Sequence, residues 1–469
     1  MNSGGTPWRA LWKYLGGTAT SRAGDEMTAP ALLLLGFAVT GRPAVGSALL
    51  AGLTIAAAVG GPVFGALLDR SPRPDRVLAL FLSAYALGII AVAAAVGRLA
   101  VPLVVLIAVA AGLFNPAVAG GWTSQLPRIV TGPELARGFA LDAMTYSAAS
   151  LVGPALAAVI AAWLGARPAV ITSAALVALA IPAACSLSRY PPASASGPRS
   201  APHRQVSEGF AAILTRRPLL RATATSVLSY VGIGMLLVCC PVLGAQRLGG
   251  SARGALLISA IAAASLAANW ILARRAPRGQ PDVRVLVSTL VIGVSMAVAA
   301  AAPGWLIVPA VALGGVGEGP QLTALFAVRH RESPEHMRGQ IFTTAASLKI
   351  GGLAAGAALA GPLAGRSVTA CLLIAAGFQV CAAAAYGLIG PPAKAARPAS
   401  RLPSAARTGP ETDTTARSEE SLLCLWGAIR IGFPVVAGRL GRLTFTRVRG
   451  RPDGRPFSFF LGRRLSGRP

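Results

Sequence analysis

Six ionisable side chains lie inside apolar stretches of this 469-residue chain. They are Arg22, Asp25, Glu26, Asp142, Glu318 and Lys349. A charged side chain near the centre of a bilayer costs at least ~2.5–3.5 kcal/mol, so such groups are candidates for function. At a rise of 1.5 Å per residue, Asp25, Glu318 and Lys349 each lie about 16 Å from a helix end. We therefore expect these three near the membrane midplane, where transporters bind substrates and coupling ions. Asp142 lies only about 7 Å inside its helix, which favours an interfacial position.

Each of these side chains also has a purely structural interpretation. Arg22 and Glu26 are four residues apart on one helix, so we expect them to neutralise each other. That pairing leaves Asp25 without a local partner and makes it the main candidate for carrying a proton. Glu318 and Lys349 form either a static pair or a site for substrate or proton, and the spacing does not choose between these alternatives.

Other polar residues give weaker signals. Asn115, Tyr146, Asn269 and Gln321 are candidates for lining a cavity, although ordinary hydrogen bonding between helices is the favoured interpretation. The histidines sit in basic connections without ligand partners, and the cysteines lack metal-ligand spacing, so we expect no metal site. The sequence contains no P-loop and no credible pairing of nucleophile and base. We therefore expect neither an enzyme nor a bound cofactor.

Composition indicates the elements that must position these groups. Hydrophobic residues make up 54% of the chain and charged residues 13%, and the mean hydropathy is +0.62. Soluble domains carry about 25% charged residues, so the chain is expected to be an all-α membrane protein. We predict twelve transmembrane helices, at 14–40, 45–68, 77–97, 101–123, 139–164, 168–188, 219–245, 253–273, 283–302, 304–328, 339–363 and 367–389.

The net charge of +27 follows the membrane topology. Alternate connections between the predicted helices hold eighteen arginines, whereas the intervening connections hold six. Basic residues concentrate in cytoplasmic loops, so both termini are predicted to be cytoplasmic in a multi-pass protein of the plasma membrane. This distribution explains the charge without nucleic acid as a partner.

The chain also repeats itself at an interval near 200 residues. The segment from Pro133 to Gly138 recurs as Pro334 to Gly339, each time just before a predicted helix. Two six-helix halves in the same orientation form the parallel repeat of many transporters. We predict an N-terminal half over 1–190, a cytoplasmic central loop over 191–218 and a C-terminal half over 219–390. A basic and mostly disordered cytoplasmic tail is predicted for 391–469.

Three segments resemble motifs of a known family. The segment from Gly65 to Arg76 resembles the major facilitator superfamily signature Gly-x-Leu-x-Asp-Arg-x-Gly-Arg-Arg. The segment from Ala149 to Ala158 resembles the antiporter motif of the fifth helix and contains Gly153 and Pro154. Ser21 to Asp25 is similar to the helix 1 entry of the drug and siderophore exporter branch, which includes enterobactin and macrolide exporters.

The resemblance implies a fold, a site and a latch. It implies the major facilitator fold, with helices 1, 4, 5, 7, 8, 10 and 11 around a central cavity. It implies that Asp69, with Gly65, Arg70 and Arg73, meets the start of helix 11 and closes the cytoplasmic side. A helix N-terminus favours a carboxylate through its free N–H groups and its dipole.

These observations predict a secondary active exporter that works by alternating access as a monomer. Protons would move inward through Asp25 or Glu318 while a small amphipathic or cationic molecule moves out. Burial disfavours an ionised carboxylate, so proton and cation can compete for one site. A proton-coupled importer and a membrane sensor or scaffold without transport are the alternatives.

Overall fold

The computed structural model describes residues 7–189, 202–250, 253–275 and 280–390, and these residues are helical throughout with short connections. The predicted tail over 391–469 lies outside the described residues. The long helices are α1 (Pro7–Thr40), α2 (Pro43–Arg70), α3 (Pro74–Ala95), α4 (Val101–Gly112), α6 (Glu134–Leu164), α7 (Ala166–Leu179), α9 (Pro202–Thr215), α10 (Arg217–Arg247), α11 (Gly254–Arg274), α12 (Pro281–Ala301), α13 (Ile307–Glu332), α14 (Arg338–Arg366) and α15 (Val368–Leu388). Short elements are η1 (Asn115–Ala117), α5 (Gly120–Gln125), η2 (Leu126–Arg128), α8 (Ile181–Cys185), η3 (Ser186–Arg189), η5 (Gly304–Leu306) and η6 (Glu335–Met337).

Proline and glycine set the helix boundaries. Pro43, Pro74 and Pro281 occupy the first helical turn, where the missing N–H of proline removes no hydrogen bond. Gly41 follows α1 with φ +64°, and Gly165 separates α6 from α7 with φ +98°. These backbone conformations favour glycine because it has no Cβ atom. The sharp reversals let consecutive helices run antiparallel with short connections.

In the part of the chain that the structure describes, ten helical segments are long and apolar enough to span a membrane by length and hydropathy alone. The twelve-helix fold includes two more, α1 and α13, which fall outside that group. Asp25 and Glu26 lower the hydropathy of α1, and Glu318 and Gln321 lower that of α13. The two helices that are hardest to detect by hydropathy are therefore those that carry the acids of the cavity.

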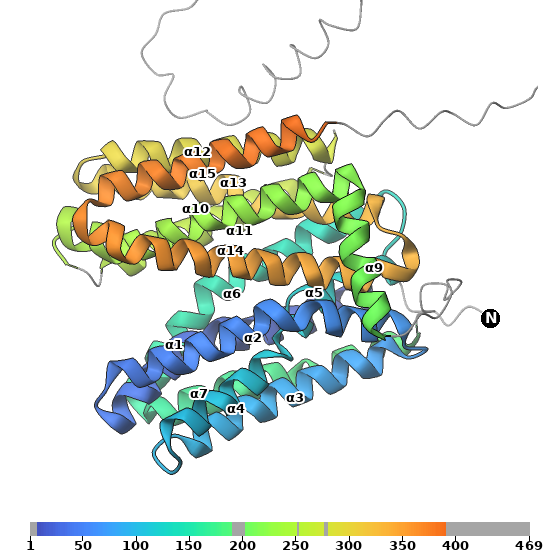
Figure 1. The fold of residues 1–469 in the computed structure, drawn as a ribbon, viewed down its shortest axis with the longest axis horizontal. Coiled ribbons are helices and arrows are strands. Elements are labelled where there is room, and N and C mark those ends of the chain that lie inside the picture. Colours follow the sequence, from blue (N-terminus) through green and yellow to red (C-terminus); the bar gives the residue numbers. More distant parts are fainter. Residues whose placement is uncertain (1–6, 190–201, 251–252, 276–279, 391–469) are drawn as a thin grey trace, which may run out of the picture. The chain divides into compact units, whose positions relative to one another are not determined.

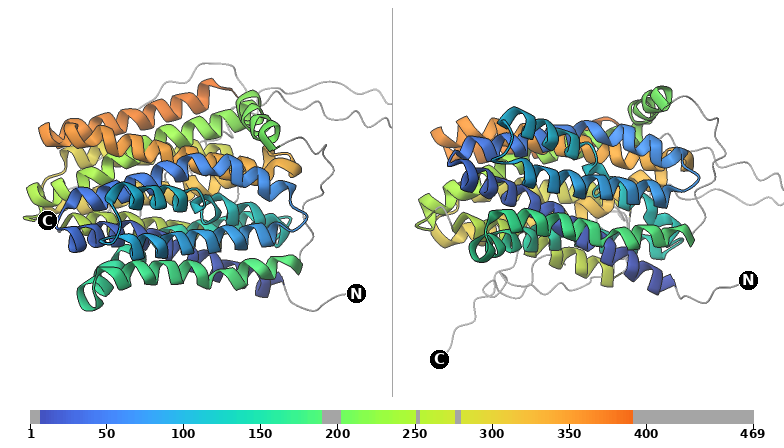
Figure 2. Two further views of the ribbon diagram at one scale, coloured as in Figure 1. Left: turned by 60° about the horizontal axis from the view of Figure 1, so that its bottom comes forward. Right: turned by 90° about the horizontal axis from the view of Figure 1, so that it is seen from below.

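The helices form two bundles that correspond to the two halves of the repeat (Figure 1). One apolar core draws almost entirely on α1 to α8, and a second one draws on α10 to α15. The two views in Figure 2 show the long helices of both bundles running roughly side by side. Small residues permit this packing: a Cβ atom on Gly36 would meet the backbone of Gly46 on α2, and one on Gly24 would meet α7 near Ser173.

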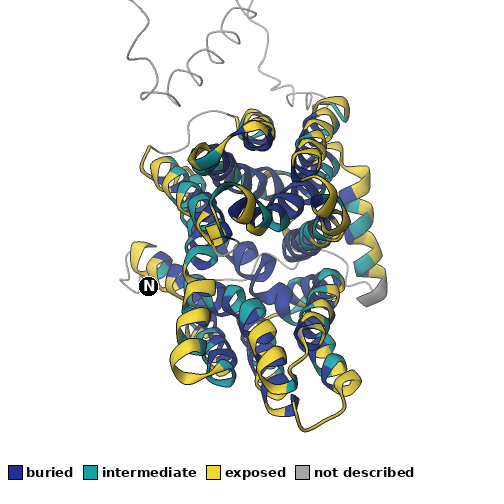
Figure 3. Ribbon diagram, turned by 90° about the vertical axis from the view of Figure 1, so that its left-hand side faces the viewer, coloured by how far each residue is buried: buried dark blue, intermediate teal, exposed yellow. Residues whose placement is uncertain are grey.

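The outer surface of the bundles is apolar, as expected for helices in contact with lipid. Figure 3 shows exposed residues facing outward and buried residues facing inward. Leu80, Leu87 and Val380 are each more than 60% exposed although they lie in the middle of helices. Polar groups are instead collected inside the protein, where they can pair with one another.

Three details differ from the twelve uninterrupted helices of the prediction. The sixth helix is interrupted at Ala180, between α7 and α8. The fourth helix breaks after Gly112, where Asn115–Ala117 forms a 3-10 turn before α5 continues the path. The central connection contains the helix α9, which crosses the ends of the other helices (Figure 1). The prediction of a loop over 191–218 missed α9, whose segment is amphipathic rather than continuously apolar.

Candidate functional site

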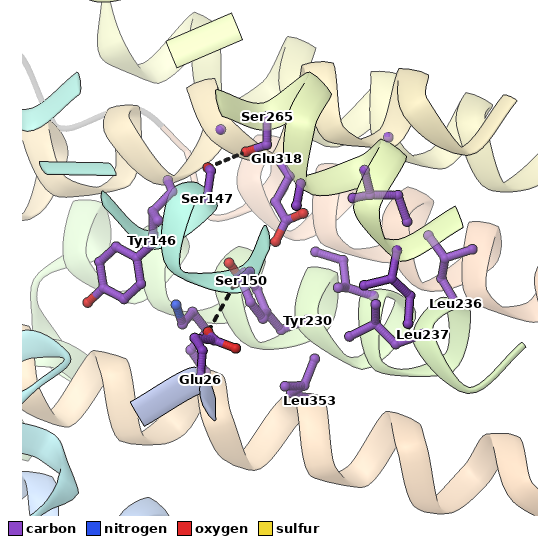
Figure 4. Close-up of a pocket in the computed structure, with 18 of the residues that line it drawn as sticks. Glu26, Tyr146, Ser147, Ser150, Tyr230, Leu236, Leu237, Ser265, Glu318 and Leu353 are labelled. Atoms are coloured by element: carbon purple, nitrogen blue, oxygen red, sulfur yellow. Dashed lines mark hydrogen bonds between the residues drawn. The ribbon is translucent and has the colours of Figure 1, made fainter. Parts of the chain in front are cut away.

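A cavity of about 300 Å³ lies between the two bundles. All seven helices that the resemblance assigned to the central cavity contribute to it, and Ile292 of α12 is an additional contributor. Glu26 and Glu318 lie in the polar part, whereas Leu236 and Leu237 lie to one side of them (Figure 4). Asp25 and Lys349 also line the cavity. The site therefore combines three acids and one amine with an apolar wall.

Glu26 is positioned by α6. The hydroxyl of Ser150 donates a hydrogen bond of 3.0 Å to Oε1 of Glu26 (Figure 4). A Cβ atom on Gly153 would lie 2.8 Å from the Cβ atom of Glu26, so glycine is needed for this close approach of α1 and α6. Pro154 lines the cavity one residue further on. The antiporter-like motif thus lies directly against the acid-bearing turn of α1.

Lys349 lies between two tyrosines that belong to different halves. Its ammonium group is 5.2 Å from the ring centroid of Tyr146 on α6 and 4.6 Å from that of Tyr230 on α10. Both distances suit cation–π attraction. Among the described residues, no carboxylate lies within 4.0 Å of this ammonium group. The predicted pair of Glu318 and Lys349 is therefore not a direct salt bridge, although both residues line the cavity.

Asp25 has neutral partners. Its Oδ1 atom accepts hydrogen bonds of 2.6 Å from the hydroxyl of Tyr85 and 2.6 Å from Nδ2 of Asn115. Nδ2 of Asn115 also lies 3.1 Å from the hydroxyl of Tyr85. The break in the fourth helix places Asn115 here. These donors orient the carboxylate and favour its ionised form, and among the described residues no cationic side chain forms a salt bridge with it.

Arg22 pairs with Asp142 on α6, which corrects the predicted pairing with Glu26. The distance from Nη1 to Oδ1 is 2.9 Å, and the side chains are 2% and 0% exposed. Tyr14 and Thr123 donate further hydrogen bonds of 2.9 Å and 2.8 Å to this carboxylate. Asp142 is thus fully buried inside the protein, while its expected position near the membrane interface remains a prediction.

Of the four polar residues that were candidates for lining the cavity, one lines it and three do not. Tyr146 lines the cavity, and its ring also stacks 3.6 Å from the guanidinium carbon of Arg22. Gln321 donates a hydrogen bond of 2.7 Å to Thr289, and Asn269 accepts one of 3.0 Å from Thr323. Asn115, Asn269 and Gln321 are not among the residues that line the cavity. For the latter two, the favoured interpretation of bonding between helices holds.

Several serine and tyrosine residues of the site were not predicted from the sequence. Tyr230 faces Lys349, and Ser147 lies 2.8 Å from Ser265 across the interface of the two halves (Figure 4). Their positions in the sequence did not indicate that they would lie near the acids, because they come from helices far apart in the chain. The repeat itself predicted that the two halves would meet, but not which side chains would face each other.

Asp69 binds the start of α14. Its two carboxylate oxygens accept hydrogen bonds of 2.8 Å each from the backbone N–H groups of Gly339 and Gln340. Gly65 lies one turn away, where a Cβ atom would collide with Thr343 and with the backbone of Gln340. Asp69 and Gly65 therefore have the contacts implied by the family signature.

Arg70 and Arg73, which the signature groups with Asp69, are placed differently. Arg73 is exposed, and Nη1 of Arg70 is buried with no hydrogen-bond partner in the described part of the chain. Their contribution to the latch remains a prediction.

The seam between α2 and α14 continues from Asp69 toward the middle of the protein. The hydroxyl of Thr343 donates a hydrogen bond of 2.8 Å to the carbonyl oxygen of Gly61, and that of Ser347 donates one of 2.8 Å to Ala57. The spacing of four residues on each helix produces one contact per turn. These contacts hold the two halves together at the Asp69 end.

An aromatic layer formed by Phe139, Phe326 and Phe342 lies between the cavity and the Asp69 end of the protein. The ring centroids of Phe139 and Phe326 are 6.1 Å apart, and so are those of Phe326 and Phe342. Arg329 lies one turn beyond Phe326 and is 2% exposed. Its Nε and Nη2 atoms have no hydrogen-bond partner among the described residues. The cavity is thus separated from the Asp69 end by aromatic rings and a buried guanidinium.

The helix α9 is attached to the same region. Nε2 of Gln340 donates hydrogen bonds of 2.9 Å and 3.1 Å to the carbonyl oxygens of Gln205 and Val206. The backbone of Gln340 binds Asp69, so one residue joins the connecting helix to both halves.

Comparison with known proteins agrees with this architecture. Residues 14–357 match the family model of the Major Facilitator Superfamily. The chain is 28% identical over 394 residues to the uncharacterized MFS-type transporter y4rN of Sinorhizobium fredii, covering 82% of this chain and 95% of that protein.

Solved structures share the fold at low identity. The human organic anion transporter MFSD10 (TETRAN) has a TM-score of 0.66 at 16% identity, covering 82% of this chain and 100% of that one. A bacterial homologue of the iron transporter ferroportin, in an outward-facing state, has a TM-score of 0.66 at 15% identity, covering 81% and 99%. From the family match, the twelve-helix fold and the cavity between its halves, the chain belongs to the major facilitator superfamily of membrane transporters.

Proposed function

We propose that this transporter exports a small amphipathic cation in exchange for protons by alternating access. The observation that carries the proposal is the cavity shared by both halves, in which Asp25, Glu26 and Glu318 face a single amine, that of Lys349. An excess of carboxylates favours a cationic ligand. The apolar wall, which includes Leu236 and Leu237, suits the hydrophobic part of an amphipathic molecule.

Asp25 and Glu318 take different roles in this proposal. Asp25 carries the proton, because it faces the cavity, its hydrogen-bonding partners Tyr85 and Asn115 are neutral, and no cationic side chain among the described residues forms a salt bridge with it. Glu318 comes from the opposite half and recognises the positive charge of the substrate. A cation and a proton then compete for one acidic cavity, which couples their movements in opposite directions.

The direction of transport follows from the proposed orientation. We place the Asp69 end on the cytoplasmic side of the plasma membrane, with both termini there, because arginines are concentrated in the connections at that end. The protein would act as a monomer, since one chain supplies the whole cavity. The resemblance of Ser21 to Asp25 to the drug and siderophore exporters supports export.

Reconstitution tests the proposal directly. Purified protein is inserted into vesicles with an imposed pH gradient, and uptake of tetraphenylphosphonium is followed together with internal pH. Inverted membrane vesicles should accumulate the cation when their lumen is acidic, and each cation taken up should release protons. Accumulation only when the medium outside the vesicles is acidic would identify proton symport, as expected of an importer. Absence of flux for cations, anions and neutral amphiphiles alike would refute transport of small amphipathic molecules.

A further inference from the structure

Lys349 is the basic residue that faces the cavity, and its surroundings are those of a bound ligand. The ammonium group lies 5.2 Å and 4.6 Å from the ring centroids of Tyr146 and Tyr230. Glu26 and Glu318 line the same cavity. Two aromatic faces with acids nearby form the type of box that recognises alkylammonium ligands.

This environment provides no direct salt bridge that would hold the lysine in place. Within the described residues, none of the ion pairs includes Lys349. Lysine carries its charge on a flexible stem of four carbons and can withdraw from the rings. The side of the helix at Gly351, two residues further on, has open space, because the nearest atom to the position of a Cβ atom there is that of Ala58 at 3.9 Å.

From these contacts we infer that Lys349 is a tethered competitor, which occupies the cation subsite between Tyr146 and Tyr230 until a substrate cation displaces it. The inference rests on the proposed function and specifies its substrate as a monovalent organic cation. When no substrate is bound, the ammonium group of Lys349 partly neutralises the acids of the cavity. When a substrate is bound, it takes over the same rings and carboxylates, and the lysine side chain withdraws from them.

Displacement of Lys349 would change a contact between the two halves, because the two tyrosine rings belong to different halves. Tyr146 belongs to α6 of the first half, whereas Tyr230 and Lys349 belong to the second half. Lys349 therefore bridges the halves through its contact with Tyr146. When a substrate replaces the lysine, that bridge passes to the substrate, so this contact between Tyr146 and the second half persists only while a cation of either kind occupies the subsite.

Equilibrium binding of tetraphenylphosphonium to purified protein tests the inference. Lys349→Met removes the competing charge but keeps the length of the side chain, so the cation should bind about tenfold more tightly than in the wild type. Lys349→Arg retains the charge and should bind as weakly as the wild type. The neutral triphenylphosphine oxide should bind all three proteins alike. Lys349→Gln serves as a second neutral variant if Lys349→Met does not fold.

A double variant identifies the subsite. Adding Tyr230→Leu to Lys349→Met should abolish the gain, whereas adding Tyr230→Phe should preserve it, because phenylalanine keeps the aromatic face. The inference is overturned if the neutral variants bind the cation no more tightly, or if the neutral probe gains equally. Absence of cation binding to every variant overturns the inference and the proposed substrate together. Binding with the expected gain, but without proton-linked flux, would instead refute only the proposed exchange.

Discussion

Arg22 and Asp142 form an ion pair between α1 and α6, with 2.9 Å between Nη1 and Oδ1 and both side chains almost fully buried. Arg22 also donates hydrogen bonds to the backbone oxygen of Asp142, to Thr123 and to Thr145. A buried charge is costly unless it is paired and its remaining hydrogen-bonding groups are satisfied. This pair thus secures α1, the helix that carries Asp25 and Glu26, against the antiporter-like helix α6.

Asp142→Asn should destabilise the protein strongly, because it leaves the guanidinium of Arg22 buried without a counter-charge. Removing one partner of a buried pair costs about 3–5 kcal/mol. Thermal unfolding in detergent, followed by tryptophan fluorescence, should show a clear fall in Tm. The double variant Arg22→Met/Asp142→Leu should recover much of the loss, because it removes both charges. Equal Tm values for Asp142→Asn and the wild type would contradict a structural role for the pair.

Asp69→Asn should slow transport while leaving cation binding nearly unchanged. The carboxylate accepts two backbone hydrogen bonds from the start of α14, and the amide can accept at only one of these positions. The charge is worth about 0.3–2 kcal/mol at a helix N-terminus, which is enough to change the populations of two states severalfold. Glu335→Gln is the matched control, because Glu335 is an exposed acid beside the same helix end. Wild-type flux in Asp69→Asn would rule out the latch.

Gly65→Ala should favour the state that is open at the Asp69 end. A Cβ atom at this position collides with Thr343 and with the backbone of Gln340, and overpacking costs about 1–3 kcal/mol. Spin labels at positions 73 and 335 should report a longer distance in the variant. Gly351→Ala adds the same methyl group at a roomy position and should leave the distance distribution unchanged. Identical distributions in wild type and Gly65→Ala would show that closure does not depend on this contact.

Asp25→Asn should abolish proton-coupled flux without preventing the cation from binding. Asparagine has the size of aspartate but cannot exchange a proton, so a loss reports on protonation rather than packing. Glu318→Gln should weaken cation binding instead, because Glu318 lines the cavity from the opposite half. The measurement is cation uptake with internal pH in the same vesicles. Should Asp25→Asn retain the normal ratio of protons to cations, the carrier lies elsewhere, and Glu26, which also lines the cavity, would be tested next.

Arg329→Met should raise Tm and reduce the rate of transport. Arg329 is 2% exposed, and two of its nitrogen atoms have no hydrogen-bond partner in the part of the chain that the structure describes. Opening of the Asp69 end would hydrate the guanidinium, so its burial penalises the closed state. Replacing a buried ion by an apolar group of similar size is often neutral or stabilising. A fall in Tm would instead indicate that Arg329 contributes favourable interactions to the closed state.

The sequence by itself determined the membrane class, the twelve helices, the two repeated halves and the family. Hydrophobicity, basic residues and short motifs are local properties, so they can be recognised without knowledge of distant contacts. It also identified most of the charged residues of the site, because a charge inside an apolar helix is conspicuous wherever it points. The contact of Asp69 with the start of helix 11 followed from the resemblance of its loop to the family signature.

Only the tertiary structure decided which of these groups meet. Arg22 has Glu26 one turn away on its own helix, yet it pairs with Asp142, which is 120 residues distant in the sequence. Lys349 faces two tyrosines rather than forming a salt bridge with Glu318. Helical spacing fixes neighbours within a helix, but the rotation of each helix against the next is set by close packing of small residues such as Gly153. That rotation determines whether a buried charge is paired, hydrogen-bonded by neutral groups or left facing the cavity.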